Sequence, residues 1–381
     1  MKSLATRLVK AGSRLHRLTR LVTKVNLRQS RLPLDKKIAI IHLSRLGSLR
    51  ERFFLQILRL LWTLDYRAIY YLDNMDTVFQ LAKCNESVIS DYNLVLSRAL
   101  PSASNQCLLV CDTDIKALLR MEWRAVLNIE FDLSRSREEF TNPMYVPYPD
   151  RSVGWLTGEI EKNRNLRKPI RVLFSGAYRG YGDRGIKRFL GKMERDEVVE
   201  VFQKFPGTRV IESKADLDAV LEAENDDAFC CFVNTDKFRI PQEDWFSVLG
   251  RTQVFLCPPG VVQPVCHNAV EAMAVGAVPL INYSEWFHPR LTPDVNCLAF
   301  SDKAELTIKL ERLMTIDNRS LLSLSRAATA YYDNYLDPEV FAGKLRERIS
   351  GGSSGETIQL VMMTEIADFL PRLKSNSVAF G

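Results

Sequence analysis

Short runs of apolar residues alternate with stretches of helical periodicity along most of the chain. The first series of runs occupies 36–43, 67–72, 93–97, 107–111 and 125–131. Continuous apolar runs of this length are typical of strands buried on both faces of a parallel sheet. Helical or loop material separates them, so the pattern predicts βαβ units and a doubly wound domain over residues 35–140.

The same alternation restarts at residue 169 after an interruption. The second series of runs occupies 169–177, 208–213, 228–234, 253–259, 277–283 and 296–300. An amphipathic helix follows, over about 302–315. Between the two series, the ten residues 141–150 include three prolines, which exclude a continuous helix or a central strand. The predicted fold class is therefore α/β, with a second Rossmann-like domain at 169–349 and an interdomain connection at 141–168.

Both ends of the chain carry segments outside this alternation. Residues 1–34 hold nine Lys or Arg and no acidic residue, and apolar positions recur every three or four residues. This spacing predicts an amphipathic cationic helix suited to an anionic membrane surface. A coiled-coil seam, a helix packed on the body and a transit peptide remain open alternatives. At the other end, residues 350–381 are expected to form a Gly/Ser linker and an apolar-faced helix over 357–370.

Charge and cysteine usage narrow the class of protein. The net charge of +6 resides in the first 34 residues, since the remainder has 43 basic and 46 acidic residues. A nucleic-acid-binding protein would spread basic charge over its folded domains, so no nucleic-acid partner is expected. The eight cysteines form no CxxC pair and lie mostly in apolar runs, which is typical of buried thiols in a reducing compartment. We therefore expect a cytoplasmic protein, peripheral to the membrane.

The most informative stretch runs from residue 244 to residue 289. A buried strand ends in Pro-Pro-Gly, and a short helix and another strand follow. Glu271 lies one turn into that helix and shares a face with His267 and Asn268. The start of a helix offers unpaired N–H groups and partial positive charge, which suit a diphosphate. Taken singly, Glu271 is a residue that favours a helix start, and His267 is an ordinary surface residue.

The segment VEAMAVGAVPLI (270–281) resembles the nucleotide-sugar-binding motif of GT-B glycosyltransferases. The flanking DWFSVLGRTQVFLCPPG and SEWFHP are similar to the exostosin-like branch of that superfamily. The resemblance implies two Rossmann-like domains facing a cleft, with the acceptor in the first and the nucleotide-sugar donor in the second. It also implies that Glu271 hydrogen-bonds the ribose hydroxyls of the donor, and that neither a metal nor another cofactor is needed.

The resemblance assigns further residues to the donor site. The loop after the strand at 169–177 would face the diphosphate with Arg179, Arg184 and Lys187, and Arg binds phosphate through paired hydrogen bonds. The remaining donor residues are Gly260, in the Pro-Pro-Gly turn, together with His267 and Asn268. Gln263 would lie at the reacting centre, where retaining members carry a first Glu. A neutral Gln there leaves the retaining or inverting course open.

The first domain carries two weaker signals. His42 follows the first strand, where the family's loop faces the acceptor, so it would be the general base of an inverting reaction. A structural strand-end His is the alternative. Asp112 and Asp114 imitate the metal-binding Asp-x-Asp of GT-A transferases, although an Asp that caps the following helix explains them as well. Four scattered histidines do not predict a zinc site.

The expected function is transfer of a sugar from a nucleotide-sugar donor to an acceptor hydroxyl in polysaccharide biosynthesis. The acceptor would be a glycan or a glycolipid, and residues 1–31 would bind the anionic membrane that carries it. Two alternatives remain open at this stage. One is a non-catalytic GT-B-like partner in a polysaccharide assembly complex. The other is a metal-dependent GT-A-like transferase that uses Asp112 and Asp114.

We predict that the full-length protein binds vesicles containing anionic lipid, because Lys and Arg of residues 1–31 are attracted to the surface. Sedimentation with vesicles should show binding that weakens as salt is added, because salt screens this attraction. Deletion of residues 1–31 should release the protein. Full-length protein that ignores anionic vesicles at low salt would contradict the membrane interpretation.

Overall fold

The computed structural model describes residues 37–43, 51–73, 94–100, 104–112, 116–130, 153–179, 186–223, 228–260 and 264–361. Contacts between Cα atoms divide the chain into two compact units. Unit 1 holds the described residues up to 130 and those from 341 onward, and unit 2 holds those from 153 to 340. The helix expected over 1–34 lies outside the described residues.

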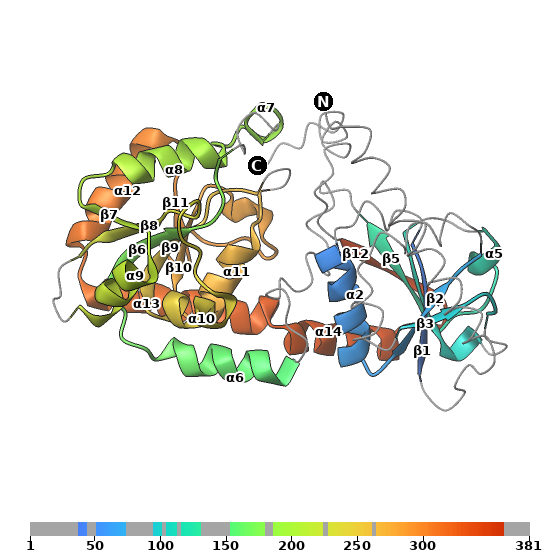
Figure 1. The fold of residues 1–381 in the computed structure, drawn as a ribbon. Coiled ribbons are helices and arrows are strands. Elements are labelled where there is room, and N and C mark those ends of the chain that lie inside the picture. Colours follow the sequence, from blue (N-terminus) through green and yellow to red (C-terminus); the bar gives the residue numbers. More distant parts are fainter. Residues whose placement is uncertain are drawn as a thin grey trace, which may run out of the picture. The chain divides into compact units, whose positions relative to one another are not determined.

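Unit 1 is built on a six-stranded sheet in which every neighbouring pair is parallel, in the order β12-β5-β4-β1-β2-β3 (Figure 1). Its strands are β1 (Ile38–His42), β2 (Arg67–Tyr71), β3 (Val95–Ser97), β4 (Leu108–Cys111), β5 (Ala125–Glu130) and β12 (Glu356–Val361). Its helices are α2 (Glu51–Thr63), η2 (Ser104–Gln106), α5 (Lys116–Leu119) and most of α14 (Pro338–Gly351). The strands expected in the first domain are confirmed.

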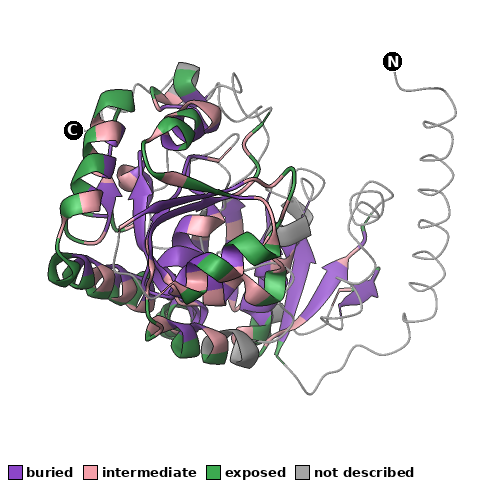
Figure 2. Cartoon of the chain, turned by 60° about the vertical axis from the view of Figure 1, so that its left-hand side comes forward, coloured by how far each residue is buried: buried purple, intermediate pink, exposed green. Residues whose placement is uncertain are grey.

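The core of unit 1 explains why these runs form buried strands. Alternate residues of β1, β2 and β4 join one apolar cluster with Trp123, and Ile40 and Leu109 in it are fully buried. On α2, Phe54, Leu58 and Leu61 recur at helical spacing and are buried as well. Figure 2 shows the strands as almost continuously buried, as expected for a parallel sheet covered on both faces.

The last described strand corrects an expectation. Residues 357–361 are not part of the helix expected over 357–370. They belong to β12, which pairs with β5 over six residues from Glu356↔Ala125 to Val361↔Glu130. Thr357 is exposed and Gln359 is half-buried on this strand, with Ile358 and Leu360 in the core. A period of two is the strand signature, but a short apolar run does not by itself separate a strand from a helix.

The approach to β12 is fixed by hydrogen bonds within unit 1. Arg124 donates from Nη2 to the carbonyl oxygens of Ile349 and Ser350, at 2.6 and 2.7 Å. Ser354 Oγ donates to the carbonyl of Trp123 at 3.0 Å. The segment 350–356, which was expected to be a flexible linker, is therefore an anchored connection, and residues 341–349 belong to unit 1 rather than to the second domain.

Unit 2 contains the second parallel six-stranded sheet, in the order β11-β10-β9-β6-β8-β7. Its strands are β6 (Ile170–Ser175), β7 (Thr208–Ile211), β8 (Cys230–Val233), β9 (Thr252–Leu256), β10 (Val278–Ile281) and β11 (Leu298–Ala299). Its helices are α6 (Val153–Arg164), α7 (Ile186–Leu190), α8 (Arg195–Lys204), α9 (Lys214–Glu222), α10 (Gln242–Gly250), α11 (His267–Ala274), η4 (Ser284–Trp286), α12 (Lys303–Thr315), α13 (Asn318–Tyr331) and η5 (Tyr332–Leu336). The second series of strands and the helix at 302–315 are confirmed, so the α/β class with two Rossmann-like sheets holds.

The two faces of this sheet bury different helices. Alternate strand residues such as Val172, Phe232 and Val254 form one cluster with apolar residues of α8 and α12. On α8 these are Val198, Val199 and Phe202, at the spacing of one helical face. Helix α10 contacts β9, and helix α11 contacts β10, but neither helix contributes a residue to that cluster, so both cover the other face of the sheet. The sheet is thus doubly wound.

The helix α6 fills part of the interval expected to be an interdomain connection. It packs on α10, and the contact is close: a Cβ on Gly250 would lie 2.4 Å from the carbonyl oxygen of Asn163. Only glycine permits this approach, because any larger residue would force the two helices apart. The prolines at 141–150 lie outside the described residues, and α6 begins after them.

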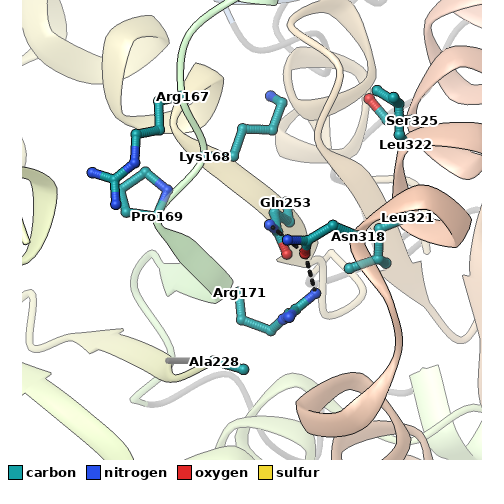
Figure 3. Close-up of a pocket in the computed structure, with 10 residues that line it drawn as sticks. All are labelled: Arg167, Lys168, Pro169, Arg171, Ala228, Gln253, Asn318, Leu321, Leu322 and Ser325. Carbon is teal, nitrogen blue, oxygen red and sulfur yellow. Dashed lines mark hydrogen bonds between the residues drawn. The ribbon is translucent and has the colours of Figure 1, made fainter. Parts of the chain in front are cut away.

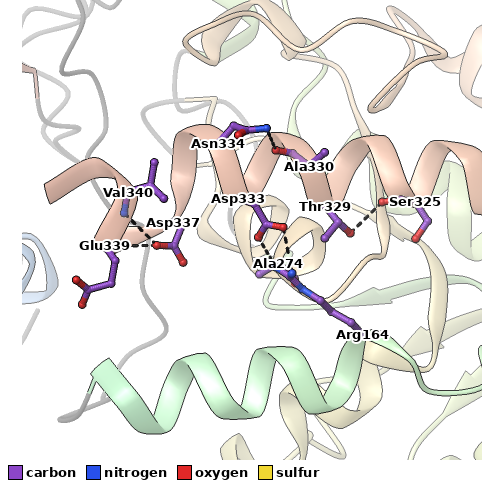
Figure 4. Close-up of polar contacts among 10 residues, drawn as sticks. All are labelled: Arg164, Ala274, Ser325, Thr329, Ala330, Asp333, Asn334, Asp337, Glu339 and Val340. Carbon is purple, nitrogen blue, oxygen red and sulfur yellow. Dashed lines mark hydrogen bonds and ion pairs between the residues drawn. The ribbon is translucent and has the colours of Figure 1, made fainter. Parts of the chain in front are cut away.

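The carboxyl end of α11 is held by three side chains. Arg164 Nε donates to the carbonyl of Ala274 at 2.8 Å, and its guanidinium pairs with Asp333 of η5 (Figure 4). Lys168 Nζ donates to the carbonyl of Val275 at 3.3 Å, and Ser325 Oγ to that of Gly276 at 2.6 Å. Gly276 has a φ of +76°, as expected for the residue that ends the helix. Positive charge at this end also interacts favourably with the helix dipole, whose negative end lies at the last carbonyls.

None of the seven cysteines in the described ranges forms a disulfide, and all seven are buried, which agrees with the expected small hydrophobic side chains. Within the same ranges, no helix combines the length and the apolar character that spanning a bilayer requires.

We predict that Ile358→Ala destabilises unit 1 by about 2–5 kcal/mol, because it removes a buried side chain from β12. Hydrogen–deuterium exchange should accelerate in peptides covering 38–42 and 125–130, with little change over 170–175. Thr357→Ala is the matched control, since Thr357 is exposed on the same strand. Equal acceleration in both units would show that β12 does not belong to unit 1 alone.

Candidate functional site

The carboxyl ends of β6 and β9 define a topological switch point in unit 2. These strands are adjacent, and the connection after β6 leads to α8 on one face, whereas the connection after β9 leads to α11 on the other. In open α/β sheets, ligands bind outside the strand ends at such a point. The 270–281 motif spans the second of these connections, so the structure places the motif at the edge where a ligand is expected.

Arg195, the first residue of α8, ties the two connections together. Its side chain is 9% exposed. Nε donates to the carbonyl of Pro259 after β9, at 3.0 Å, and Nη1 to that of Ala177 after β6, at 3.1 Å. Nη2 lies 3.3 Å from the Sγ of Cys266, which precedes α11. A buried positive charge therefore lies at the switch point, next to the start of α11.

Cys266 supplies the negative partner of this arginine. Burial by itself raises the pKa of the thiol, but the charges of Arg195 and His267 and hydrogen bonds from His267 and the Asn268 backbone lower this pKa to about 5. The helix start adds further positive potential. The neighbouring thiol of Cys257 behaves differently, because burial raises its pKa well above the usual value. The pKa of Cys266 is thus lowered and that of Cys257 raised, although both thiols are buried.

Glu271 is held in one orientation by a tryptophan. The indole N–H of Trp245, on α10, donates to Oε2 of Glu271 at 2.7 Å, and Glu271 is 4% exposed. Trp245 in turn packs edge-on against Phe255 of β9, with 5.7 Å between ring centroids. Glu271 is thus a positioned carboxylate and not a solvated residue near a helix start.

Asn268 brings an amide to the same edge. Its Oδ1 is buried and has no hydrogen-bond partner, and its Nδ2 lies 3.9 Å from the position that a Cβ on Gly176 would take. Gly176 follows β6, so Asn268 and Arg195 both approach the turn at the end of this strand. His267 lies beside Cys266, with 3.9 Å between Nδ1 and Sγ. Gly260 closes the turn after β9 by donating its N–H to Pro264 at 2.9 Å.

The basic residues expected to bind diphosphate are distributed differently. Arg179 is exposed and pairs with Asp236 at 3.0 Å. Lys187 is exposed and pairs with Glu197 at 2.7 Å. Each of these cations already has a carboxylate partner, so neither concentrates positive charge at the strand ends. Arg184 and Gln263 lie outside the described residues.

Arg195 is the residue that the sequence interpretation missed. The signal was present, because Val198, Val199 and Phe202 follow it at spacings of three, four and seven and define the buried face of α8. Arg195 lies at the first position of that face, where the spacing favours burial. Its neighbours Asp196 and Glu197 are acidic, so the local sequence instead indicates a solvated arginine at the start of a helix.

In unit 1, His42 lies at the carboxyl end of β1, paired in register with Cys111 of β4. Its Nε2 is 3.1 Å from Oδ1 of Asp73, and the imidazole is 3% exposed. Asp112 follows β4 and is buried, while Asp114 lies outside the described residues. Over the described ranges, no group of three or more His, Cys, Asp or Glu side chains is arranged to hold a metal ion.

Comparison with known proteins gives similarity at the level of structure alone. No family model and no curated protein matches the chain. Anabaena HepE in complex with UDP is 12% identical over 83% of this chain and 100% of its own, with a TM-score of 0.45. Sucrose-phosphate synthase from Thermosynechococcus elongatus is 12% identical over 84% of this chain and 100% of its own, with a TM-score of 0.42. At this identity and score, neither similarity carries an inference about chemistry.

We predict that stability increases with pH between about 5 and about 9 and that Cys266 causes this increase. In this interval the unfolded chain binds the thiol proton and the folded chain does not, so the unfolding free energy rises by at most about 1.4 kcal/mol per pH unit. Denaturant titrations at pH 6 and pH 8 should show a smaller pH dependence in Cys266→Ser. Cys257→Ser is the control, and an equal loss in both variants would refute the thiolate.

Proposed function

We propose that the chain is a glycosyltransferase whose unit 2 binds a nucleoside-diphosphate sugar at the carboxyl ends of β6 and β9. The observation that carries the proposal is the buried guanidinium of Arg195 at the switch point, beside the start of α11. It coincides with the segment that resembles the GT-B donor motif, so two independent features, one electrostatic and one of sequence, favour the same edge.

The electrostatics of this edge suit a diphosphate. Arg195 and the start of α11 add positive potential at this edge. Electrostatic interactions are stronger here than in water, because the dielectric constant of the protein interior is low. The diphosphate becomes the leaving group when the sugar is transferred, and fixed donors stabilise the negative charge that develops on it. Arg195 already donates to two carbonyls, so it would act through its field and through the turns it fixes, while the N–H groups of those turns bind oxygen.

Glu271 would accept hydrogen bonds from the ribose hydroxyls. An ionised carboxylate has about four acceptor positions, of which Trp245 occupies one. The tryptophan fixes the carboxylate before the ligand arrives, which lowers the entropy lost on binding. Asn268, with an unsatisfied buried Oδ1 close to the turn after β6, would add a donor or acceptor for the same ligand.

Unit 1 would bind the acceptor, with His42 as the group that takes the proton of the attacking hydroxyl. Asp73 is placed to orient the ring and to stabilise its protonated form. Both ring nitrogens are buried, so the imidazole has to become accessible before it takes part in catalysis. A glycan or glycolipid acceptor at an anionic membrane, reached through residues 1–31, is the substrate class that the cationic N-terminal segment favours.

We predict that Glu271→Gln weakens binding of the preferred nucleoside diphosphate tenfold to a hundredfold. A hydrogen bond to a charged group is worth about 1.5–3 kcal/mol, and the substitution keeps the shape of the side chain. Calorimetry should begin with UDP, GDP, ADP and CDP, to identify the base. Pyrophosphate, which lacks the ribose, should bind wild type and Glu271→Gln equally.

Arg195→Lys should show the complementary pattern in the same titrations. Lysine keeps the positive charge but lacks the planar guanidinium that bonds both turns. The affinities for the nucleoside diphosphate and for pyrophosphate should therefore fall together, while the affinity for the bare nucleoside should change little. Arg312→Lys, at an exposed arginine of α12, is the charge-matched control. If no nucleoside diphosphate binds the folded wild type, the donor site is refuted and the non-catalytic alternative gains support.

A further inference from the structure

A second concentration of positive charge lies at the opposite edge of the unit 2 sheet. A cavity of about 300 Å³ opens where β6 and β9 begin and α13 starts (Figure 3). It is lined by Arg167, Lys168, Pro169, Arg171, Ala228, Gln253, Asn318, Leu321, Leu322 and Ser325. The proposed donor site lies at the carboxyl ends of these strands, so this cavity cannot belong to it.

Arg171 is the most unusual residue of the cavity. It is 8% exposed, its Nε is buried without a hydrogen-bond partner, and Nη1 donates only to Oδ1 of Asn318, at 3.2 Å. Burial lowers its pKa, and no carboxylate among the described residues counteracts this effect. A buried cation without a counter-ion is costly, and structures normally avoid it by pairing.

The other two cations of the cavity also have no acidic partner within the part of the chain that the structure describes. Lys168 donates to the carbonyls of Gly250 and Val275, and burial lowers its pKa to about 8. Arg167 donates from Nη1 to the carbonyl of Ala223. Asp317, which precedes α13, is committed to Ser320 and does not line the cavity. Among the described residues, three cations therefore surround one cavity without forming an ion pair.

The remaining lining residues define the rest of the ligand. Leu321, Leu322, Pro169 and Ala228 add apolar surface to the lining, and Figure 3 shows the two leucines on α13, across from Arg167. The volume is at the lower limit of small-molecule pockets and exceeds what a bare oxyanion fills. We propose that this cavity binds a small organic anion, with a phosphate or carboxylate group on Arg171 and an apolar body against Leu321 and Leu322.

Calorimetric titration of the full-length protein tests the proposal with four probes: phenyl phosphate, benzoate, inorganic phosphate and uncharged benzyl alcohol. We expect phenyl phosphate or benzoate to bind more tightly than inorganic phosphate, and benzyl alcohol not to bind. Phosphate groups also suit the proposed donor site, so each titration is repeated in Arg195→Lys. Binding at this cavity persists in that variant, whether or not the proposed function holds.

Two variants address the cavity itself. Arg171→Met should lower the affinity for the organic anions at least tenfold, because it removes the charge and keeps the length of the side chain. Leu322→Trp should also lower this affinity, because the larger side chain fills the cavity. Leu322 is half-exposed, so the substitution does not disturb the core. Arg326→Gln, exposed on the same helix and outside the lining, should have no effect. Circular dichroism confirms that each variant is folded.

Three results would overturn the proposal. The first is the absence of binding by both organic anions. The second is benzyl alcohol binding as tightly as phenyl phosphate, which would mean a purely apolar cavity. The third is an unchanged anion affinity in folded Arg171→Met.

Discussion

The guanidinium of Arg195 fixes the edge of unit 2 on which the candidate site depends. It bonds the turns after β6 and β9 and lies against Cys266, so the positions of both turns and of the start of α11 follow from one buried charge. That charge is tolerable because it donates to two carbonyls and to the sulfur of Cys266, a thiol whose pKa is lowered.

The other end of α11 is constrained by complementary physics. Arg164 and Lys168 bring positive charge to the last carbonyls of the helix, and Ser325 adds a hydroxyl donor. Their bonds reach α11 from the α6–β6 segment and from α13, so two parts of unit 2 converge on one short helix. A helix of eight residues has little stability of its own. Tertiary contacts at both ends therefore decide where Glu271 and Asn268 lie.

The sequence predicted the strands well because a parallel sheet buries both faces and leaves unbroken apolar runs, as at 107–111 and 277–283. It failed at 357–361, where an isolated apolar segment has the composition of either element and only pairing with β5 decides. In the site, Glu271 was found because a motif surrounds it. Arg195 was missed because two of the groups that accept its hydrogen bonds, the carbonyl of Pro259 and the thiol of Cys266, lie more than sixty residues away in the chain.

The return of the chain to unit 1 also determines when each unit can form during synthesis. The central strands β1, β4 and β5 leave the ribosome first, but the β5 edge lacks its partner until residue 361 has been made. Unit 2 is contiguous from 153 to 340 and can complete its sheet before then. The usual order, in which the N-terminal domain folds first, is therefore reversed for the final step. Until then, β5 presents a bare strand edge, which is a site for aggregation or chaperone binding.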